Sequence, residues 1–102
     1  MEKDLLKIIE HYGVLPQLKY FQSEVFELTE AIIDYSYVEV YKDSPAEKHL
    51  KKHIAEEIAD VQVMLDQFQH YYGITDEEIW ETMKYKINRQ LERIEKEKEN
   101  EL

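Results

Sequence analysis

The sequence predicts an all-α fold: a helical bundle of three long helices preceded by one short N-terminal helix. Only two glycines and two prolines occur among 102 residues, and 35% of the residues are charged, which is typical of long helices with few turns. Apolar residues recur at alternating spacings of three and four, the period of an amphipathic helix. A chain of this length builds only a small core, so we expect one domain completed by oligomerisation.

The first break between predicted helices lies at residues 13–16. Residues 2–12 form a short amphipathic helix, and Gly13 ends it, as glycine commonly does at a helix C-terminus. Pro16 begins a second helix, where its missing N–H group costs nothing, and this helix runs to about Tyr41. We call the row of apolar positions on one side of a helix its seam. The seam of the second helix is Leu18, Phe21, Val25, Leu28, Ile32 and Tyr35.

The third helix is bounded by clear start and stop signals. Ser44 caps its N-terminus and Pro45 occupies its first position. The helix then runs to about Tyr72, and Gly73 ends it. Its seam consists of Leu50, Ile54, Ile58, Val61, Leu65, Phe68 and Tyr72.

A capping box predicts the start of the fourth helix. Thr75 is the N-cap residue, and Glu78 lies three residues later, where its side chain can return to the Thr75 N–H group. The seam continues to Ile94, so we expect the helical domain to span residues 1–94. Residues 95–102 are charged and lack an apolar repeat, which predicts a frayed tail. The seam of the fourth helix is Ile79, Met83, Ile87, Leu91 and Ile94.

Composition and charge exclude several classes of protein. No cysteine is present, so the chain has no disulfide, zinc–thiolate site or thiol nucleophile, and a reducing cytoplasm is the expected location. No apolar run approaches the roughly 20 residues of a membrane span. Residues 1–15 lack the basic start and continuous apolar core of a signal peptide. A net charge of −10 argues against binding of a nucleic acid polymer, although a metal ion can still hold a small anion.

Two carboxylate pairs point to a metal site. The positions one residue before the seam form a second row, the polar stripe, at the edge of the core. It contains Glu24 and Glu27 on the second helix and Glu57 and Asp60 on the third. Residues three apart share a helix face, so all four carboxylates converge if these helices pack side by side. Single pairs of this spacing arise by chance in an acidic chain, but two beside successive seams predict a Mg²⁺ site, because clustered carboxylates need a cation.

Basic and histidine residues allow further interpretations. Lys86, Arg89 and Arg93 line the fourth helix, either as a solvated basic face or, opposite a metal, as partners for a triphosphate. His49 and His53 have the i, i+4 spacing of a transition-metal site. The Glu-x-x-His repeats of a four-helix di-iron centre are absent, which favours polar helix surface for both histidines.

Three segments together resemble the MazG-like all-α nucleoside triphosphate pyrophosphohydrolases. They are SEVFELTEAI (residues 23–32), EEIADV (56–61) and KINRQLER (86–93), within a region of similarity spanning about residues 17–93. The signature of that family is EExxE on one helix and ExxD on the next. Ser23 stands where the family usually has a glutamate, which leaves the number of metal ions open. The resemblance implies that Mg²⁺ is held by Glu24, Glu27, Glu57 and Asp60.

The resemblance also implies a reaction and a substrate. The reaction is hydrolysis of the α–β phosphoanhydride of an NTP or dNTP, giving NMP and pyrophosphate, with Glu27 or Glu57 as the catalytic base. Family members are dimers or tetramers, so a homodimer or homotetramer is expected. The residues expected to bind the substrate are Gln17, which begins the polar stripe of the second helix, and Lys86, Asn88, Arg89 and Arg93.

A different class of protein remains as the alternative. A non-catalytic acidic helical module would use the acidic surface or the seam to bind a protein partner. Such a module predicts no specific effect of Mg²⁺ on stability. The position of each polar stripe directly beside its seam is the feature that favours the enzyme.

Overall fold

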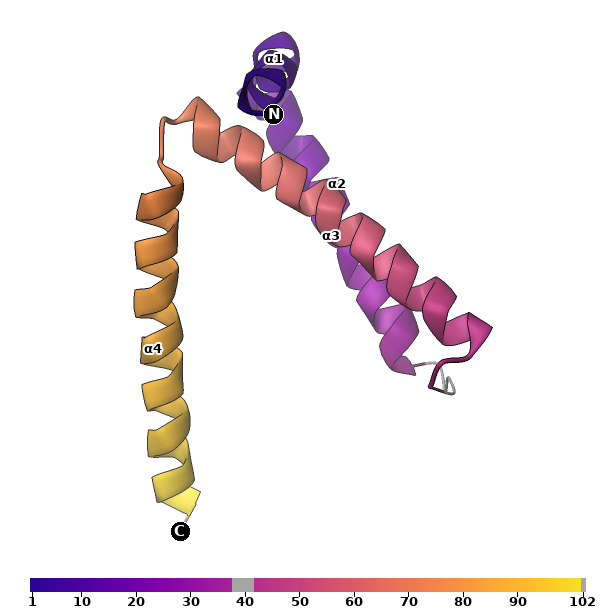
Figure 1. Ribbon diagram of the computed structural model, residues 1–102, viewed down its shortest axis with the longest axis vertical. Coiled ribbons are helices and arrows are strands. Elements are labelled where there is room, and N and C mark those ends of the chain that lie inside the picture. Colours follow the sequence, from indigo (N-terminus) through magenta and orange to yellow (C-terminus); the bar gives the residue numbers. More distant parts are fainter. Residues whose placement is uncertain (38–41, 102) are drawn as a thin grey trace. The chain divides into compact units, whose positions relative to one another are not determined.

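The computed structural model describes residues 1–37 and 42–101, and every element within these ranges is an α-helix (Figure 1). The all-α prediction is therefore confirmed. Contacts divide the chain into two compact units, Met1–Tyr72 and Gly73–Leu102, so a boundary falls inside the predicted domain of residues 1–94. Each unit is described by itself. Of the described helices, none has the length and apolarity that crossing a bilayer requires.

The short first helix and the start of the second follow from the residues between them. Helix α1 spans Glu2–Tyr12, and Leu5 and Ile9 are its buried residues. Gly13 has a φ of 91°, a left-handed conformation that favours glycine, and it lets the chain turn sharply into α2. Helix α2 spans Val14–Tyr37, so it begins slightly before Pro16. The predicted end at Tyr41 lies outside the described residues.

Helix α3 spans Pro45–Tyr71 and has the predicted cap. The backbone N–H of Glu47 donates a hydrogen bond to Ser44 Oγ at 3.1 Å. This bond satisfies one of the N–H groups that have no partner within the first turn. Local side-chain chemistry therefore explains where this helix starts.

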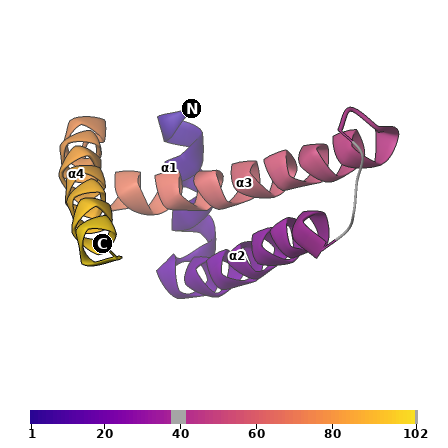
Figure 2. The same ribbon diagram turned by 90° about the horizontal axis from the view of Figure 1, so that it is seen from below.

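Helices α2 and α3 lie side by side and antiparallel, and α1 packs across both (Figures 1 and 2). Gln17 Nε2 donates to Gln67 Oε1 at 2.9 Å near the start of α2 and the end of α3. Further along, the rings of Phe21 and Phe68 meet edge to face with centroids 5.8 Å apart. This register brings the middle of α2, with Glu24, against the middle of α3.

The polar stripe lies at the centre of the face that α2 turns toward α3, and the seam lies at the edge of that face, where Phe21 meets Phe68. Gln17, Glu24 and Ala31 are buried in α2, whereas the seam residues Val25 and Ile32 are 38% and 45% exposed. The prediction of the seam as the core and the stripe as its edge is therefore wrong for this pair. One long neighbour covers only one face of a helix, and here that face is the stripe. The buried apolar side chains of the described residues are Leu5, Ile9, Ala31 and Met64.

Helix α4 spans Asp76–Glu101 and begins at the predicted capping box. The N–H of Glu78 donates to Thr75 Oγ1 at 3.1 Å, and the N–H of Thr75 donates to Glu78 Oε2 at 2.8 Å. The helix continues past Ile94 to Glu101, and fraying of its last turns stays a prediction. Glutamate and lysine are good helix formers, and pairs such as Glu95 and Lys98, 3.9 Å apart, support the last turns.

Candidate metal centre

Three carboxylates from two helices meet in the middle of the α2–α3 pair. Glu24 comes from α2, and Glu57 and Asp60 come from successive turns of one face of α3. One oxygen atom of each lies within 4.8 Å of the others. The convergence of these stripe residues was predicted from their spacing, and the antiparallel register produces it.

Two of these carboxylates are buried and lack a full set of partners. Glu24 is 4% exposed and Glu57 is 9% exposed. Within residues 1–37 and 42–101, neither Glu24 Oε2 nor Glu57 Oε2 has a hydrogen-bond partner. A buried carboxylate oxygen without a donor is costly, because the group loses its hydration and gains nothing in return. The two orphaned oxygens are therefore an independent indication that the site is built to receive a cation.

The raised pKa values of Glu24 and Glu57 reflect the same lack of a counter-charge. Burial raises the pKa of Glu24, and the negative charges of Glu27 and Asp60 raise it further, while a hydrogen bond from Tyr20 acts in the opposite direction. Burial also raises the pKa of Glu57, again reinforced by Glu27 and Asp60, and partly offset by His53. Without a cation, the folded chain thus disfavours full ionisation of its own cluster.

The fourth predicted ligand, Glu27, borders the cluster from the solvent side. It is exposed, yet its negative charge helps to raise the pKa of Glu57. All four predicted carboxylates are therefore neighbours. Ser23, at the position where the resembled family has glutamate, donates its hydroxyl to the Lys19 carbonyl at 3.4 Å.

Two residues beside the cluster were not predicted as parts of it. The Tyr20 hydroxyl is hydrogen-bonded to Glu24, and this bond is the main reason that the pKa of Tyr20 is raised. His53 Nδ1 lies 4.0 Å from Glu57 Oε1. Both precede their glutamate by four residues on the same helix face, and this spacing is the signal that could have found them.

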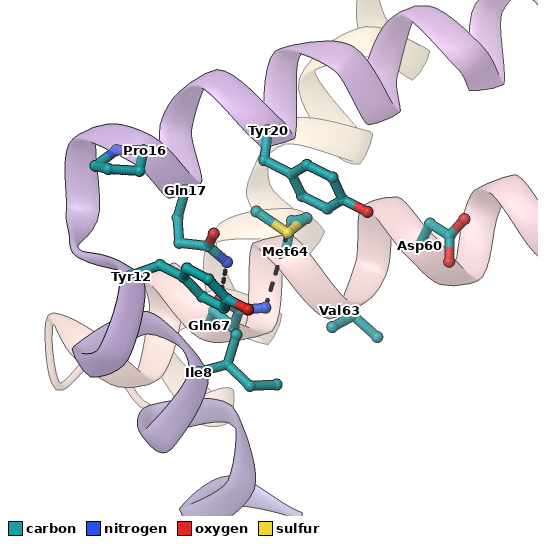
Figure 3. A pocket seen from close by; sticks show the side chains of 9 residues that line it. All are labelled: Ile8, Tyr12, Pro16, Gln17, Tyr20, Asp60, Val63, Met64 and Gln67. Carbon is teal, nitrogen blue, oxygen red and sulfur yellow. Dashed lines mark hydrogen bonds between the residues drawn. The ribbon is translucent and has the colours of Figure 1, made fainter.

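A cavity of about 600 Å³ opens beside the carboxylates (Figure 3). Asp60 and Tyr20 belong to both the cavity and the surroundings of the cluster. Gln17, predicted to bind substrate, lies in the cavity wall. The remaining wall comes from three helices and was not predicted: Ile8, Tyr12, Pro16, Val63, Met64 and Gln67.

The predicted phosphate-binding residues all lie on α4, in the unit Gly73–Leu102. They are Lys86, Asn88, Arg89 and Arg93, and each is exposed. Arg93 Nη1 donates to Gln90 Oε1 at 3.0 Å, and the Arg89 guanidinium lies 5.6 Å from the centre of the Tyr85 ring. An approach of this basic row to the carboxylates stays a prediction.

The donor set of the cluster fits a hard divalent cation. All its ligand atoms are carboxylate oxygens, the type that Mg²⁺ and Ca²⁺ prefer. In an octahedral Mg²⁺ shell, ligand oxygens lie about 3.0 to 4.2 Å apart. The oxygens of Glu24, Glu57 and Asp60 lie within 4.8 Å of one another, so they would have to move closer together to bind one Mg²⁺ ion.

Comparisons of the chain with protein-family models, with curated proteins and with solved structures found no match. Its function therefore has to be inferred from its own residues. The structure provides a partly buried cluster of carboxylates that could hold a cation, next to a cavity that is large enough for a small organic molecule. This pairing suits chemistry on an anionic ligand that the cation and the cavity wall hold together.

Proposed function

We propose that this chain is a Mg²⁺-dependent nucleoside triphosphate pyrophosphohydrolase that converts an NTP or dNTP to NMP and pyrophosphate. One observation carries the proposal: Glu24 and Glu57 are buried, each has an oxygen without a hydrogen-bond partner, and one oxygen of each lies within 4.8 Å of an Asp60 oxygen. The sequence resemblance to MazG-like enzymes supplies the reaction. The cavity beside Asp60 supplies room for the nucleoside.

The proposed role of each carboxylate follows from its exposure to solvent. Glu24, Glu57 and Asp60 hold the cation between α2 and α3. Bound Mg²⁺ supplies positive charge to phosphate oxygens and lowers the pKa of a coordinated water. Glu27 is exposed and adjoins Glu57, so it is placed to accept the proton of an attacking water, with Glu57 as the second candidate base.

The remaining predicted residues complete the substrate site in this proposal. Gln17 contacts the nucleoside from the cavity wall. Lys86, Arg89 and Arg93 neutralise the departing pyrophosphate, and Asn88 donates to a phosphate oxygen. These residues come from α4 of the same chain or from a second copy.

A homodimer or homotetramer is the proposed assembly. Seam residues that an ordinary single-chain core would cover stay substantially exposed in α2 and α3, among them Ile32 at 45% and Ile58 at 50%. Fully burying such a side chain is favourable by about 1.5 to 3 kcal/mol, so covering the half that is still exposed gains roughly half of that for each residue. A second copy with the same seams is a self-complementary cover for them.

The proposal is tested with a panel of NTPs and dNTPs, with pyrophosphate and orthophosphate assayed separately. We expect pyrophosphate and NMP in the presence of Mg²⁺, and no product after addition of a chelator. Glu57→Gln should lower the rate roughly a thousandfold, since it removes a ligand of the cation. The matched control is Glu56→Gln, which makes the same change at the exposed neighbouring position and should keep the wild-type rate.

Two results would reject the enzyme. Orthophosphate as the sole product would indicate a different phosphohydrolase reaction. No product from any nucleotide, together with no effect of Mg²⁺ on stability, would favour the non-catalytic acidic interaction module.

A further inference from the structure

The cavity and the carboxylate cluster form one continuous surface within the unit Met1–Tyr72. Asp60 is both a cluster carboxylate and a cavity residue. Tyr20 lines the cavity, and its hydroxyl is hydrogen-bonded to Glu24. A ligand whose phosphates reach a cation at Asp60 therefore has its organic part in this cavity.

The side walls of the cavity suit a flat aromatic ring. Tyr12 from α1 and Tyr20 from α2 both line it and are 60% and 55% exposed, so their rings are accessible (Figure 3). Ile8 and Val63 add apolar surface. Aromatic side chains stack on nucleobases of every kind, because each base has a π face. The walls thus explain affinity for a base without choosing among bases.

The floor of the cavity carries hydrogen-bonding groups that can discriminate between nucleobases. Gln17 is 7% exposed and Gln67 is 2% exposed, and they are joined by the 2.9 Å bond from Gln17 Nε2 to Gln67 Oε1. The Gln17 oxygen points away from Gln67 (Figure 3). Gln67 Nε2 donates to Met64 Sδ at 3.7 Å, and a thioether is a weak acceptor. A stronger acceptor on a ligand would therefore be a better partner for this amide.

We propose that the cavity is the nucleobase subsite and that the Gln17–Gln67 amide pair selects the base by its hydrogen-bonding edge. This inference rests on the proposed function for its choice of ligand. Outside the bond that joins the two amides, the pair has an acceptor, Gln17 Oε1, and a donor, Gln67 Nε2, and each can bond to a polar group of a base. An amide pair that served only to join α2 to α3 would not need to border a cavity.

Binding of the base is measured without catalysis. The probes are AMP, GMP, CMP, UMP and dTMP, with ribose 5-phosphate as the ligand that lacks a base, all in EDTA. The chain contains three methionines. Met64 lines the cavity, and Met1 and Met83 do not, so spectra of ¹³C-methyl-labelled methionine report the site and carry internal controls. We expect the Met64 signal to shift with at least one nucleotide and not with ribose 5-phosphate.

Selection by the amide pair is measured with a double variant. Gln17→Met together with Gln67→Met removes both partners at once and leaves neither amide unsatisfied, which protects the fold. We expect the dissociation constants of the five nucleotides, which should span at least about tenfold in the wild type, to converge in this variant. The control is Gln62→Met, which makes the same change on an exposed side chain of α3 that bonds to Asp66 outside the cavity.

The outcomes separate this inference from the proposed function. Nucleotide-dependent shifts of Met64 that lose their base preference in the double variant support the inference, even if no triphosphate is hydrolysed. Equal responses to nucleotides and ribose 5-phosphate would overturn it. So would a base preference that the double variant retains, and in either case pyrophosphate release from NTPs would leave the proposed function standing.

Discussion

The α2–α3 pair contains buried carboxylates of two kinds, and the contrast between them locates the site. Glu47 is only 6% exposed, but Lys51 Nζ lies 3.1 Å from its Oε1. The hydrogen bond from Lys51 is the main cause of the lowered pKa of Glu47, aided by bonds from the Asp43 backbone and the Tyr35 side chain.

Glu24 and Glu57, near the middle of the same helices, have raised pKa values and orphaned oxygens. Burial is common to all three glutamates, so burial alone does not mark a functional site. The difference is whether the fold supplies a counter-charge. At Glu47 it does, and the carboxylate holds the helix end together; at Glu24 and Glu57 the counter-charge has to come from outside.

The largest expected difference between the two regions is their response to Mg²⁺. At a concentration one hundred times its dissociation constant, the ion should stabilise the wild type by about 2.7 kcal/mol. For a chain of this size that corresponds to a rise in Tm of roughly 10 °C or more. Thermal unfolding monitored by circular dichroism should show this rise in Glu47→Gln and lose it in Glu24→Gln. An equal Mg²⁺-dependent rise in Tm in both variants would contradict the proposed difference between Glu47 and Glu24.

The next largest effect concerns Tyr20, which orients Glu24 without belonging to the carboxylate set. Tyr20→Phe removes the hydroxyl and keeps the ring, so Glu24 loses its hydrogen bond. We expect Mg²⁺ affinity, measured by calorimetry, to fall about 10- to 100-fold, the usual cost of losing a residue that orients a metal ligand. The comparison variant is Tyr35→Phe, which removes the hydroxyl near Glu47 and should leave Mg²⁺ affinity at the wild-type value.

In the absence of metal, neutral substitutions should act in opposite directions in the two regions. Glu24→Gln with Glu57→Gln removes two uncompensated buried charges and adds amide donors for Asp60 and Glu27, so Tm should rise by a few degrees. Glu47→Gln removes the acceptor charge facing Lys51, so Tm should fall. Melting in EDTA at pH 7 checks both signs, and a fall in both variants would contradict the proposed difference.

A smaller effect should appear as a dependence on pH in the metal-free chain. The folded pKa values of Glu24 and Glu57 lie above the ordinary value of 4.5, so folding favours their protonated forms. That contribution to stability is fully present below pH 4.5 and is lost as pH rises through the raised values.

Denaturant unfolding in EDTA at several pH values measures this loss, with the double Glu24→Gln and Glu57→Gln variant as the control. The double variant should show a flatter profile than the wild type. Mg²⁺ should stabilise the wild type more as pH rises, because its ligands must be ionised. A wild-type profile that rises with pH in EDTA would contradict the raised pKa values.

The sequence predicts those parts of the fold that depend on local chemistry. The caps at Ser44 and Thr75 lie where side-chain hydroxyls compete for free N–H groups, and both helices start there. Periodicity also placed Glu24, Glu57 and Asp60 on helix faces that meet. These predictions succeed because spacing within one helix determines which side chains share a face.

What the sequence did not predict depends on packing between helices. Hydrophobicity favoured the seam as the buried face of α2, yet the stripe with Glu24 and Ala31 faces α3. The cavity combines Tyr12 with Gln67, which only the crossing of α1 over α3 brings together. No spacing along the chain encodes that crossing.

The shortness of α1 has a kinetic consequence. With 11 residues it is too short to persist as a helix in water by itself, and its buried anchors are Leu5 and Ile9. The same helix supplies Ile8 and Tyr12 to the cavity wall, whereas every carboxylate of the cluster belongs to α2 or α3. Detachment of α1 therefore uncovers the cavity while leaving the cluster assembled. A molecule bound in the cavity therefore loses two of its wall residues, Ile8 and Tyr12, whenever this one helix lifts away.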